Sequence, residues 1–540
     1  MQRFRVINRH IYWRTTGVSL SLLCVLFYLP ISHFFSLAGF HFQFSNGDGA
    51  AIWFSIWQGL IVAVASCCLA LIGAMVLYHR HFVGAHFLRS MMLIPFFIPG
   101  ISIAIGFHKI SHWPIYSLFI SHSHPVVTVI FAEILVNTPV GVGLIGGALK
   151  SISSELLDAM SMDGANSFQR FKNLTLPHLT SAIKRSFLII FFYSLSNLGI
   201  ILAVGDQSTA SIESQIYSLI QGNLNIHHLA TLAIIQSLIS VMLFFTLAGK
   251  GANISASFED KAPSRVKDRK SWRIISAYIF VLFCTLTFFI SPIELIIHGI
   301  FNPTHLWGNL NLHPAIVDVS LSGALFHTVR NALIAGVIGV SLSLGVGVGI
   351  ARNSSSLAEN KVRNRFSKFV ETFSMLPLAF SPLLIGLGFL LTFTSGMLPL
   401  RESWISTPIA QSILGLPLSV ALLCEVWKLL PREFYEEGIL SGADALTYFL
   451  YVELPLLRPA ISRAFAFLVL ISIADFSAAA FLSISHQGVL TTIFQELISH
   501  PGSGNYRSAE LINLFFILIA TTIVFLSDFN VFHRNKKLSL

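Results

Sequence analysis

The sequence predicts an all-α integral membrane protein of about twelve transmembrane helices, arranged as two parallel repeats of six. Three observations support this fold class. The composition is 54% hydrophobic and only 11% charged, apolar stretches of about twenty residues recur along the chain, and one polar segment occurs twice. A soluble protein of 540 residues needs more charge to cover its surface.

Apolar stretches long enough to cross a bilayer follow one another along the whole chain. They do not alternate as barrel strands would, so we interpret them as helices. The first stretch is too long for the core of a signal peptide, which predicts a retained first span. The twelve predicted spans are residues 17–39, 51–78, 89–109, 126–149, 182–204, 229–249, 273–296, 326–351, 369–395, 408–430, 462–483 and 509–527.

The basic residues predict the orientation of these spans. With the N-terminus in the cytoplasm, thirty of the 34 Lys and Arg residues fall on the cytoplasmic side, leaving Lys109, Arg330, Arg401 and Arg507. Cytoplasmic loops of membrane proteins carry such an excess of Lys and Arg. We therefore expect both termini in the cytoplasm, and we read the net charge of +9 as a topology signal.

A polar and basic segment, residues 250–272, predicts a cytoplasmic linker between a first half, residues 1–249, and a second half, residues 273–540. Each half has six spans, so both should enter the membrane in the same orientation. The stretch "IPFFIPGISIAIGF" at 94–107 matches "LPLAFSPLLIGLGF" at 376–389. These matches predict a duplicated and fused subunit.

The polar segment that occurs twice lies between the fourth and fifth spans of each half. It reads "ELLDAMSMDGANSFQRFKNLTLPHL" at 155–179, the first loop, and "EFYEEGILSGADALTYFLYVELPLL" at 433–457, the second loop. A constant offset of 278 residues pairs Glu155 with Glu433, Asp158 with Glu436, Gly164 with Gly442, Ala165 with Ala443, and Pro177 with Pro455.

Local chemistry predicts the same shape for both loops. Acidic residues near the start suit the positive end of a helix dipole. Gly164 and Gly442 suit a left-handed helix stop, and Asn166 and Asp444 can cap a second helix. A proline then precedes the next span. The expected result is a helix, a sharp turn and a second helix at the membrane surface.

This pattern resembles the EAA loop of ABC importer permeases, and the surrounding spans resemble the type I permease layout. The resemblance implies a bacterial inner-membrane protein, two cytoplasmic ATPase subunits that dock on the loops, and a periplasmic solute-binding protein. It places Asp158, Asp163, Gly164, Ala165, Glu436, Gly442 and Ala443 at the ATPase contact. The predicted coupling residues also include Glu155, Pro177, Glu433 and Pro455 of the same two loops. The triplets Asp-Ala-Met at 158–160 and Glu-Glu-Gly at 436–438 depart from the family's pattern, and Ser441 stands where the first loop has Asp163.

No phosphate-binding sequence of the type G-x-x-x-x-G-K-[ST] occurs in the chain. We therefore expect a transporter subunit that is not itself an enzyme and binds no cofactor, with ATP used by its partners. The run "GVGVGI" at 345–350 favours close helix packing.

Four polar residues fall inside predicted spans: Glu133, Asn197, Gln411 and Asp475. Two interpretations are open. They line the translocation pathway, where two acids without a nearby base favour a cationic solute, or they hydrogen-bond between helices.

The outer loops contain several histidines, but their spacing matches no ligand set, so we expect no metal site there. These six are His108, His112, His122, His124, His305 and His313.

Fused permeases of this layout resemble the iron(III) and thiamine import families. The stretches 196–220 and 467–510 are most similar to the thiamine permeases, and both solutes are cationic.

The alternative from another class is a twelve-span secondary transporter that is not coupled to ATP. Such carriers concentrate their signature after the second span of each half, where "HRHFVGAHFLR" at 79–89 lacks it. An intramembrane enzyme is a more distant alternative, since no catalytic constellation lies within the spans.

Overall fold

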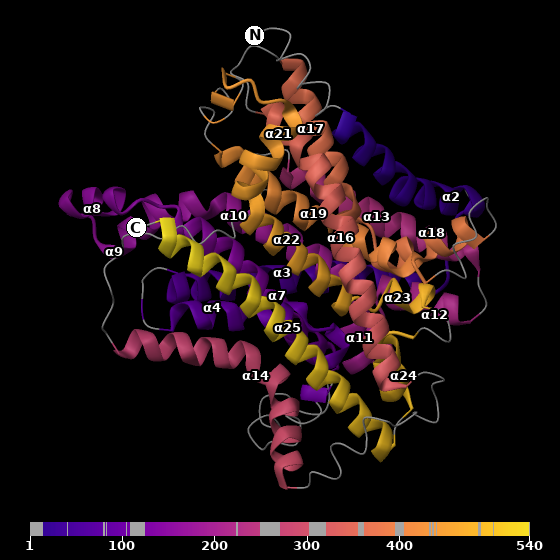
Figure 1. The fold of residues 1–540 in the computed structure, drawn as a ribbon. Coiled ribbons are helices and arrows are strands. Elements are labelled where there is room, and N and C mark those ends of the chain that lie inside the picture. The colour runs from indigo at the N-terminus through magenta and orange to yellow at the C-terminus, as the bar shows by residue number, and fades with distance from the viewer. Residues whose placement is uncertain are drawn as a thin grey trace. The chain divides into compact units, whose positions relative to one another are not determined.

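The computed structural model is helical throughout the residues that it describes, without a strand among them (Figure 1). The predicted all-α membrane class is confirmed. The described residues are 14–39, 41–78, 82, 84–103, 105–107, 125–222, 225–248, 271–301, 320–354, 361–394, 404–430, 434, 437–438, 440–483, 488–500 and 502–538.

The helices follow the order that the apolar pattern predicts. In the first half they are η1 (Cys24–Tyr28), α2 (Leu29–Ala38), α3 (Asp48–Tyr78), α4 (Ala85–Leu93), η2 (Ile94–Phe97), η3 (Gly100–Ser102), α7 (Pro125–Lys150), α8 (Ser154–Met162), α9 (Ser167–Arg170), η4 (Phe171–Thr175), α10 (Leu176–Leu195), α11 (Leu198–Val204), η5 (Gln207–Thr209), α12 (Ile212–Gln221) and α13 (Ile226–Ala248). In the second half they are α14 (Ser271–Phe301), α16 (Leu321–Ser354), α17 (Lys361–Met375), η7 (Leu376–Ala379), α18 (Pro382–Thr394), α19 (Ser406–Leu429), α21 (Ala445–Tyr448), η8 (Phe449–Glu453), α22 (Leu454–Ala474), α23 (Ala479–Leu482), α24 (Leu490–Ser499) and α25 (Ser503–Leu538).

Within the described part of the chain, nine helices are long and apolar enough to cross a membrane. Three further candidate spans are helix pairs that bend sharply at a short break, which brings the possible number to the predicted twelve. The pairs are Ala85–Phe97 with Gly100–Phe107 at 99°, Ser167–Leu195 with Leu198–Val204 at 53°, and Arg365–Ala379 with Pro382–Phe393 at 95°. The sequence predicted the existence of these spans but not their bends.

Two of the bends contain a proline, and in one of them the extended residue is the one directly before it. Pro99 disfavours the helical conformation at the residue before it, and Ile98 is accordingly extended, with φ −92° and ψ 137°. The corresponding bend in the second half contains an extended Phe380, with φ −105° and ψ 144°, two residues before Pro382. The third bend centres on Asn197, whose φ of −90° and ψ of 69° interrupt the helix.

The chain divides into two compact units whose membership differs from the two sequence halves. Unit 1 consists of Met1–Leu37, Thr328–Ile484 and Phe525–Leu540, and unit 2 of Ala38–His327 and Ser485–Val524. The first span therefore belongs to the unit built mainly from the second half, and α14 belongs to the unit built mainly from the first half. The boundaries of the sequence halves themselves stay a prediction.

In unit 1, the first span packs on helices of the second half through buried aromatic and polar contacts. The ring of Tyr28 stacks on that of Phe373 with centroids 4.1 Å apart. Its hydroxyl donates to the Phe373 carbonyl at 2.8 Å. In the first turn of the span, the Thr16 hydroxyl donates to the Gly345 carbonyl at 3.0 Å. These contacts fix the register of the span against α16 and α17.

In unit 2, α14 packs on the first half, where Ala277 and Cys284 enter the same apolar cluster as Ala70 and Val142. The approach is closest at Gly106, where an added Cβ would lie 1.8 Å from the Thr287 carbonyl oxygen. Only glycine allows the two backbones to come this near.

Candidate functional site

The first loop begins with a capped helix, as the sequence predicts. α8 starts at Ser154, and the Ser153 hydroxyl accepts a hydrogen bond from the Leu156 amide at 3.4 Å. Glu155 lies in the first turn, where its charge favours the positive end of the helix. Glu155, Asp158 and Asp163 are all exposed, so their carboxylates are available to a partner.

Both loops then turn on a glycine in the left-handed conformation. Gly164 has φ +78° and Gly442 has φ +77°, and no non-glycine residue of the described chain has a positive φ. The turns share their hydrogen bonds, because Ala165 donates to the Met160 carbonyl and Ala443 to the Gly438 carbonyl, each at 3.0 Å. This is the Schellman pattern of a helix end, and it reproduces the predicted sharp turn in both copies.

The second helix of each loop is capped by the predicted residue. Asn166 Oδ1 accepts from the Gln169 amide at 2.8 Å, while Gln169 Oε1 accepts from the Asn166 amide at 2.9 Å. In the second loop Asp444 Oδ1 accepts from the Thr447 amide at 3.1 Å. Hydrogen bonds from the Thr447 side chain and amide lower the pKa of the Asp444 carboxyl below its ordinary value.

Each loop joins its next span through one widened helical turn. The π-helical segments Phe171–Thr175 and Phe449–Glu453 directly precede α10 and α22. Pro177 and Pro455, in the first turns of α10 and α22, lack the amide that would bond to the carbonyl four residues earlier. A widened turn accommodates the missing bond and the proline ring. The conformation repeats at the same offset of 278 residues.

Exposed apolar side chains also repeat at this offset. Met162 is 89% exposed and its counterpart Leu440 is 67% exposed, and the other two pairs are similarly open. Apolar side chains held out from a polar segment indicate a contact with another protein or with the membrane. Sequence analysis missed these residues, although an apolar position shared by both copies was a readable signal. The three pairs are Leu156 with Phe434, Met162 with Leu440, and Phe168 with Leu446.

The other predicted contact residues lie along these same segments. Ala165 and Ala443 are half-buried beneath the turn, and Pro177 and Pro455 are exposed. Glu433 and Glu436 lie outside the described residues, as do the six histidines of the outer loops. The role of each of these residues stays a prediction.

Both loops rest on the apolar core of their unit. The first loop contributes Leu157 and Leu174 to a cluster that includes the buried Leu149 and Leu179. The second loop contributes Phe449, whose ring lies 6.5 Å from that of the buried Trp427. Close-packed interiors transmit displacement, since they have few voids in which to absorb it. Each loop is therefore packed against the spans of its own unit.

Glu133 lies fully buried in a polar cluster between three spans of unit 2. Its Oε2 accepts hydrogen bonds from Gln58 Nε2 at 2.5 Å and from the Ser194 hydroxyl. Gln58 also donates to Ser194 at 2.9 Å. These contacts join α3, α7 and α10, as the hydrogen-bonding interpretation of Glu133 expects.

Gln411 makes the equivalent contact in unit 1. Its Oε1 accepts from the Ser472 hydroxyl at 2.5 Å, and its Nε2 donates to Asp475 Oδ2 at 3.2 Å. Ser472 is the counterpart of Ser194 at the offset of 278. An acid–hydroxyl pair in the first half therefore corresponds to an amide–hydroxyl pair in the second.

Asn197 and Asp475, the other predicted pair, both lie where the fifth span of their half breaks. Asn197 Oδ1 accepts from the Ile200 amide at 3.4 Å and caps α11. Asp475 accepts from the Ala478 amide at 3.1 Å and the Ala479 amide at 3.2 Å at the start of α23. Helix breaks inside a membrane protein typically line a cavity or a binding site.

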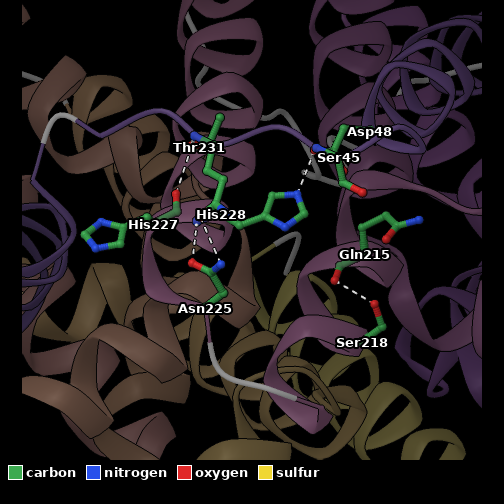
Figure 2. Close-up of polar contacts among 9 residues, drawn as sticks. Ser45, Asp48, Gln215, Ser218, Asn225, His227, His228 and Thr231 are labelled. Atoms are coloured by element: carbon green, nitrogen blue, oxygen red, sulfur yellow. Dashed lines mark hydrogen bonds and ion pairs between the residues drawn. The ribbon is translucent and has the colours of Figure 1, made fainter.

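A second buried polar cluster lies in unit 2, at the start of α3 and of α13 (Figure 2). His228 Nε2 lies 2.7 Å from Asp48 Oδ2, which also accepts from the Ser45 amide at 2.7 Å. Asn225 Oδ1 accepts from the His228 amide at 3.3 Å, and Thr231 Oγ1 accepts from the Gln43 amide at 3.0 Å. These bonds tie the segment before α3 to the start of α13.

Comparison with known proteins identifies similar transport proteins. Residues 66–251 match the family of binding-protein-dependent transport system inner membrane components. A ferric transport system permease protein of Actinobacillus pleuropneumoniae is 23% identical over 498 residues, covering 89% of this chain and 70% of that protein. A thiamine transport system permease protein of Haemophilus influenzae is 24% identical over 486 residues, covering 85% and 84%. The thiamine transport system permease protein of Escherichia coli is 22% identical over 549 residues, covering 96% and 97%.

Proposed function

We propose that this chain, a fused permease of the binding-protein-dependent transport type, is the membrane subunit of an ABC importer. Separate cytoplasmic ATPase subunits dock on the first and second loops, and a periplasmic binding protein delivers the solute. The repeated arrangement of cap, left-handed glycine, widened turn and exposed apolar side chains is the observation that supports this function. The inner membrane location and cytoplasmic termini follow from this proposal and the distribution of basic residues.

The proposed mechanism is mechanical. ATP-driven closure of two ATPase subunits moves both loops together, and each loop displaces the core on which it rests. Leu157 and Leu174 carry this displacement into unit 2, and Phe449 carries it into unit 1. Alternating access then results from a change between two packed arrangements of the spans. One chain supplies both loops, so a second permease copy is not required.

The solute is a small cation of the thiamine or iron(III) class. The similar proteins transport these two solutes, and the spans contain acids at Glu133 and Asp475. We assign the pathway to Glu133, Asn197, Gln411 and Asp475 as two related pairs. Asn197 and Asp475 are its best-supported members, because they cap helix breaks, whereas Glu133 and Gln411 bond between spans.

The test of ATPase coupling uses the two left-handed glycines. The double substitution Gly164→Val and Gly442→Val places β-branched residues at φ near +78°, where a left-handed conformation costs roughly 1–2 kcal/mol per residue. We expect ATP-driven uptake and ATPase co-purification to be lost while membrane insertion persists. Gly164→Asn with Gly442→Asn is the matched control, because asparagine tolerates this conformation. Undiminished ATP-driven uptake in the valine variant, or uptake without any ATPase subunit, would overturn the proposal.

The test of solute and pathway uses proteoliposomes with the ATPase and the paired binding protein. Radiolabelled thiamine and radiolabelled iron(III) are supplied in separate arms. We expect uptake of one of these cations, reduced at least about tenfold by Asp475→Asn, the loss that corresponds to about 1.4 kcal/mol. If neither Asp475→Asn nor Glu133→Gln changes uptake, the pathway assignment is abandoned.

A further inference from the structure

α17 is a basic helix that runs nearly perpendicular to the span that follows it. The segment Arg365–Ala379 meets Pro382–Phe393 at 95°. α18 is the apolar arm of this bent pair and α17 the basic arm, so α17 lies along the membrane surface where α18 enters the membrane. Its sequence, KVRNRFSKFVETFSM, combines basic and aromatic residues in the manner of interfacial helices.

One face of α17 is anchored to the protein. The Ser367 hydroxyl donates to the Ile350 carbonyl at 3.1 Å, and Val370 is fully buried. Phe373 stacks on Tyr28 of the first span at 4.1 Å. These contacts fix which residues of the helix face outward.

The outward face carries two cations beside an aromatic ring. Arg365, Lys368 and Phe369 are exposed, and they follow the three- and four-residue spacing that places side chains on one helix face. Phe369 is 57% exposed although it stacks on Phe373 at 5.5 Å. Within the described part of the chain, neither cation has an ion-pair partner.

The corresponding helix of the first half has no such face. α4 contains a single basic residue, Arg89, which is buried. Its Nε and Nη2 both donate to the Leu77 carbonyl, at 2.9 Å and 2.7 Å. The outward basic face is therefore specific to α17 and is not a general property of the repeat.

We propose that Arg365, Lys368 and Phe369 form a binding site for the headgroup of an anionic phospholipid. The guanidinium and ammonium groups donate to the phosphate oxygens, and the Phe369 ring enters the boundary between headgroups and acyl chains. Charge complementarity selects this occupant, since an anionic membrane surface attracts basic residues that lie within a Debye length of it. The placement of α17 at the cytoplasmic leaflet rests on the topology of the proposed function.

The test measures lipid binding to the full-length chain in detergent, without ATPase or solute, so that its result is independent of the importer assays. Phosphatidylglycerol and phosphatidylcholine with identical acyl chains are titrated, and retained lipid is counted by native mass spectrometry. Because two basic residues are removed, we expect the double variant Arg365→Gln and Lys368→Gln to lose about thirtyfold in phosphatidylglycerol affinity, with phosphatidylcholine affinity unaffected. Exchanging the two cations, as Arg365→Lys and Lys368→Arg, should retain most of the preference.

Arg458→Gln is the matched control, because Arg458 is an exposed basic residue on α22. An equal loss of phosphatidylglycerol in this control would show general charge attraction and would overturn the site. Unchanged affinity in the double variant, or displacement of the lipid by millimolar inorganic phosphate, would also overturn it. A second titration is made with the ATPase subunit present. If the double variant loses phosphatidylglycerol affinity only in this titration, α17 is a protein contact and the lipid site is overturned. An unfolding midpoint equal to that of the parent chain in phosphatidylcholine shows that the double variant is folded.

Discussion

Asp48 and His228 form a buried pair whose two members depend on each other. Replacing His228 with Leu leaves the buried Asp48 carboxylate with one hydrogen bond, from the Ser45 amide. We expect the free energy of unfolding to fall by about 3 kcal/mol, because an uncompensated buried polar or charged group is costly. Denaturant titration in detergent measures this loss.

The double variant Asp48→Asn and His228→Leu provides the control for this pair. Since it removes the carboxylate together with its partner, its loss should be smaller than the sum of the two single losses. Additive losses would show that the two side chains do not stabilise each other.

Asp444 predicts a pH dependence that is confined to the second loop. Hydrogen bonds from Thr447 depress its pKa below the ordinary value of 3.8. The contribution of this cap is therefore fully present above about pH 4 and is lost as the pH falls through the depressed pKa. Hydrogen exchange of residues 445–448, corrected for the intrinsic rate, should increase in acid.

Residues 167–170 are the internal control, because Asn166 caps this equivalent helix of the first loop without a titratable group. Asp444→Asn should remove the difference between the two loops. Equal acid sensitivity of both helices would contradict this origin of the effect.

The residues that sequence predicted well are those whose conformation is decided locally. Gly164 and Gly442 are left-handed, and Asn166 and Asp444 cap helices, because turn and cap chemistry depends on a few neighbouring backbone groups. The partners of Glu133 could not be predicted in this way. Ser194 lies 61 residues away in sequence, so only the packing of spans brings the two together.

At the scale of elements, the widened turns before α10 and α22 set the orientation of the loops relative to their spans. A π-helical turn adds one residue to the helix, which rotates the preceding segment by roughly 100°. Pro177→Ala with Pro455→Ala restores the two missing amides and allows regular helix. We expect the exposed apolar side chains to rotate away from the proposed ATPase contact, with uptake reduced about tenfold, as a loss of about 1.4 kcal/mol in docking implies.

Uptake in proteoliposomes and ATPase co-purification both measure this effect. Pro139→Ala, inside α7, is the control because the turn before Pro139 is regular α-helix. Full activity in the double alanine variant would show that the widened turns do not position the loops.

Apolar length predicted the spans better than it predicted their continuity. The bend at Pro99 has a local signal, since a proline inside an apolar stretch disfavours helix at the residue before it. The break at Asn197 has no comparable signal. A single Asn within a span is read from sequence as a buried hydrogen-bonding residue, and its capping of α11 depends on the surrounding helices.

At the scale of the whole molecule, the compact units exchange the first spans of the two sequence halves. Sequence periodicity shows that a span is apolar but not which helices it packs against. Leu23, Phe27 and Phe34 are almost completely buried within unit 1, although the repeat assigns them to the first half. The relation between halves and units therefore required the structure.

This exchange predicts that neither half is stable alone. A chain divided within the linker, residues 250–272, separates the first span from Phe373, its stacking partner, and α14 from the cluster that includes Ala70 and Val142. We expect each half expressed alone to accumulate at least severalfold less than the intact chain, because unpacked spans are removed by cellular proteolysis. Co-expression should restore both halves and allow one to co-purify with the other.

An intact chain with a protease site in the linker separates assembly from continuity. After folding, cleavage there should leave both fragments associated, because the packing of the exchanged spans does not involve the peptide bond that is cut. Residues 273–540 produced alone at full yield, with the unfolding midpoint of the intact chain, would show that the second half needs nothing from residues 14–37. In that case the contacts of Tyr28 and Thr16 would contribute little to the stability of unit 1.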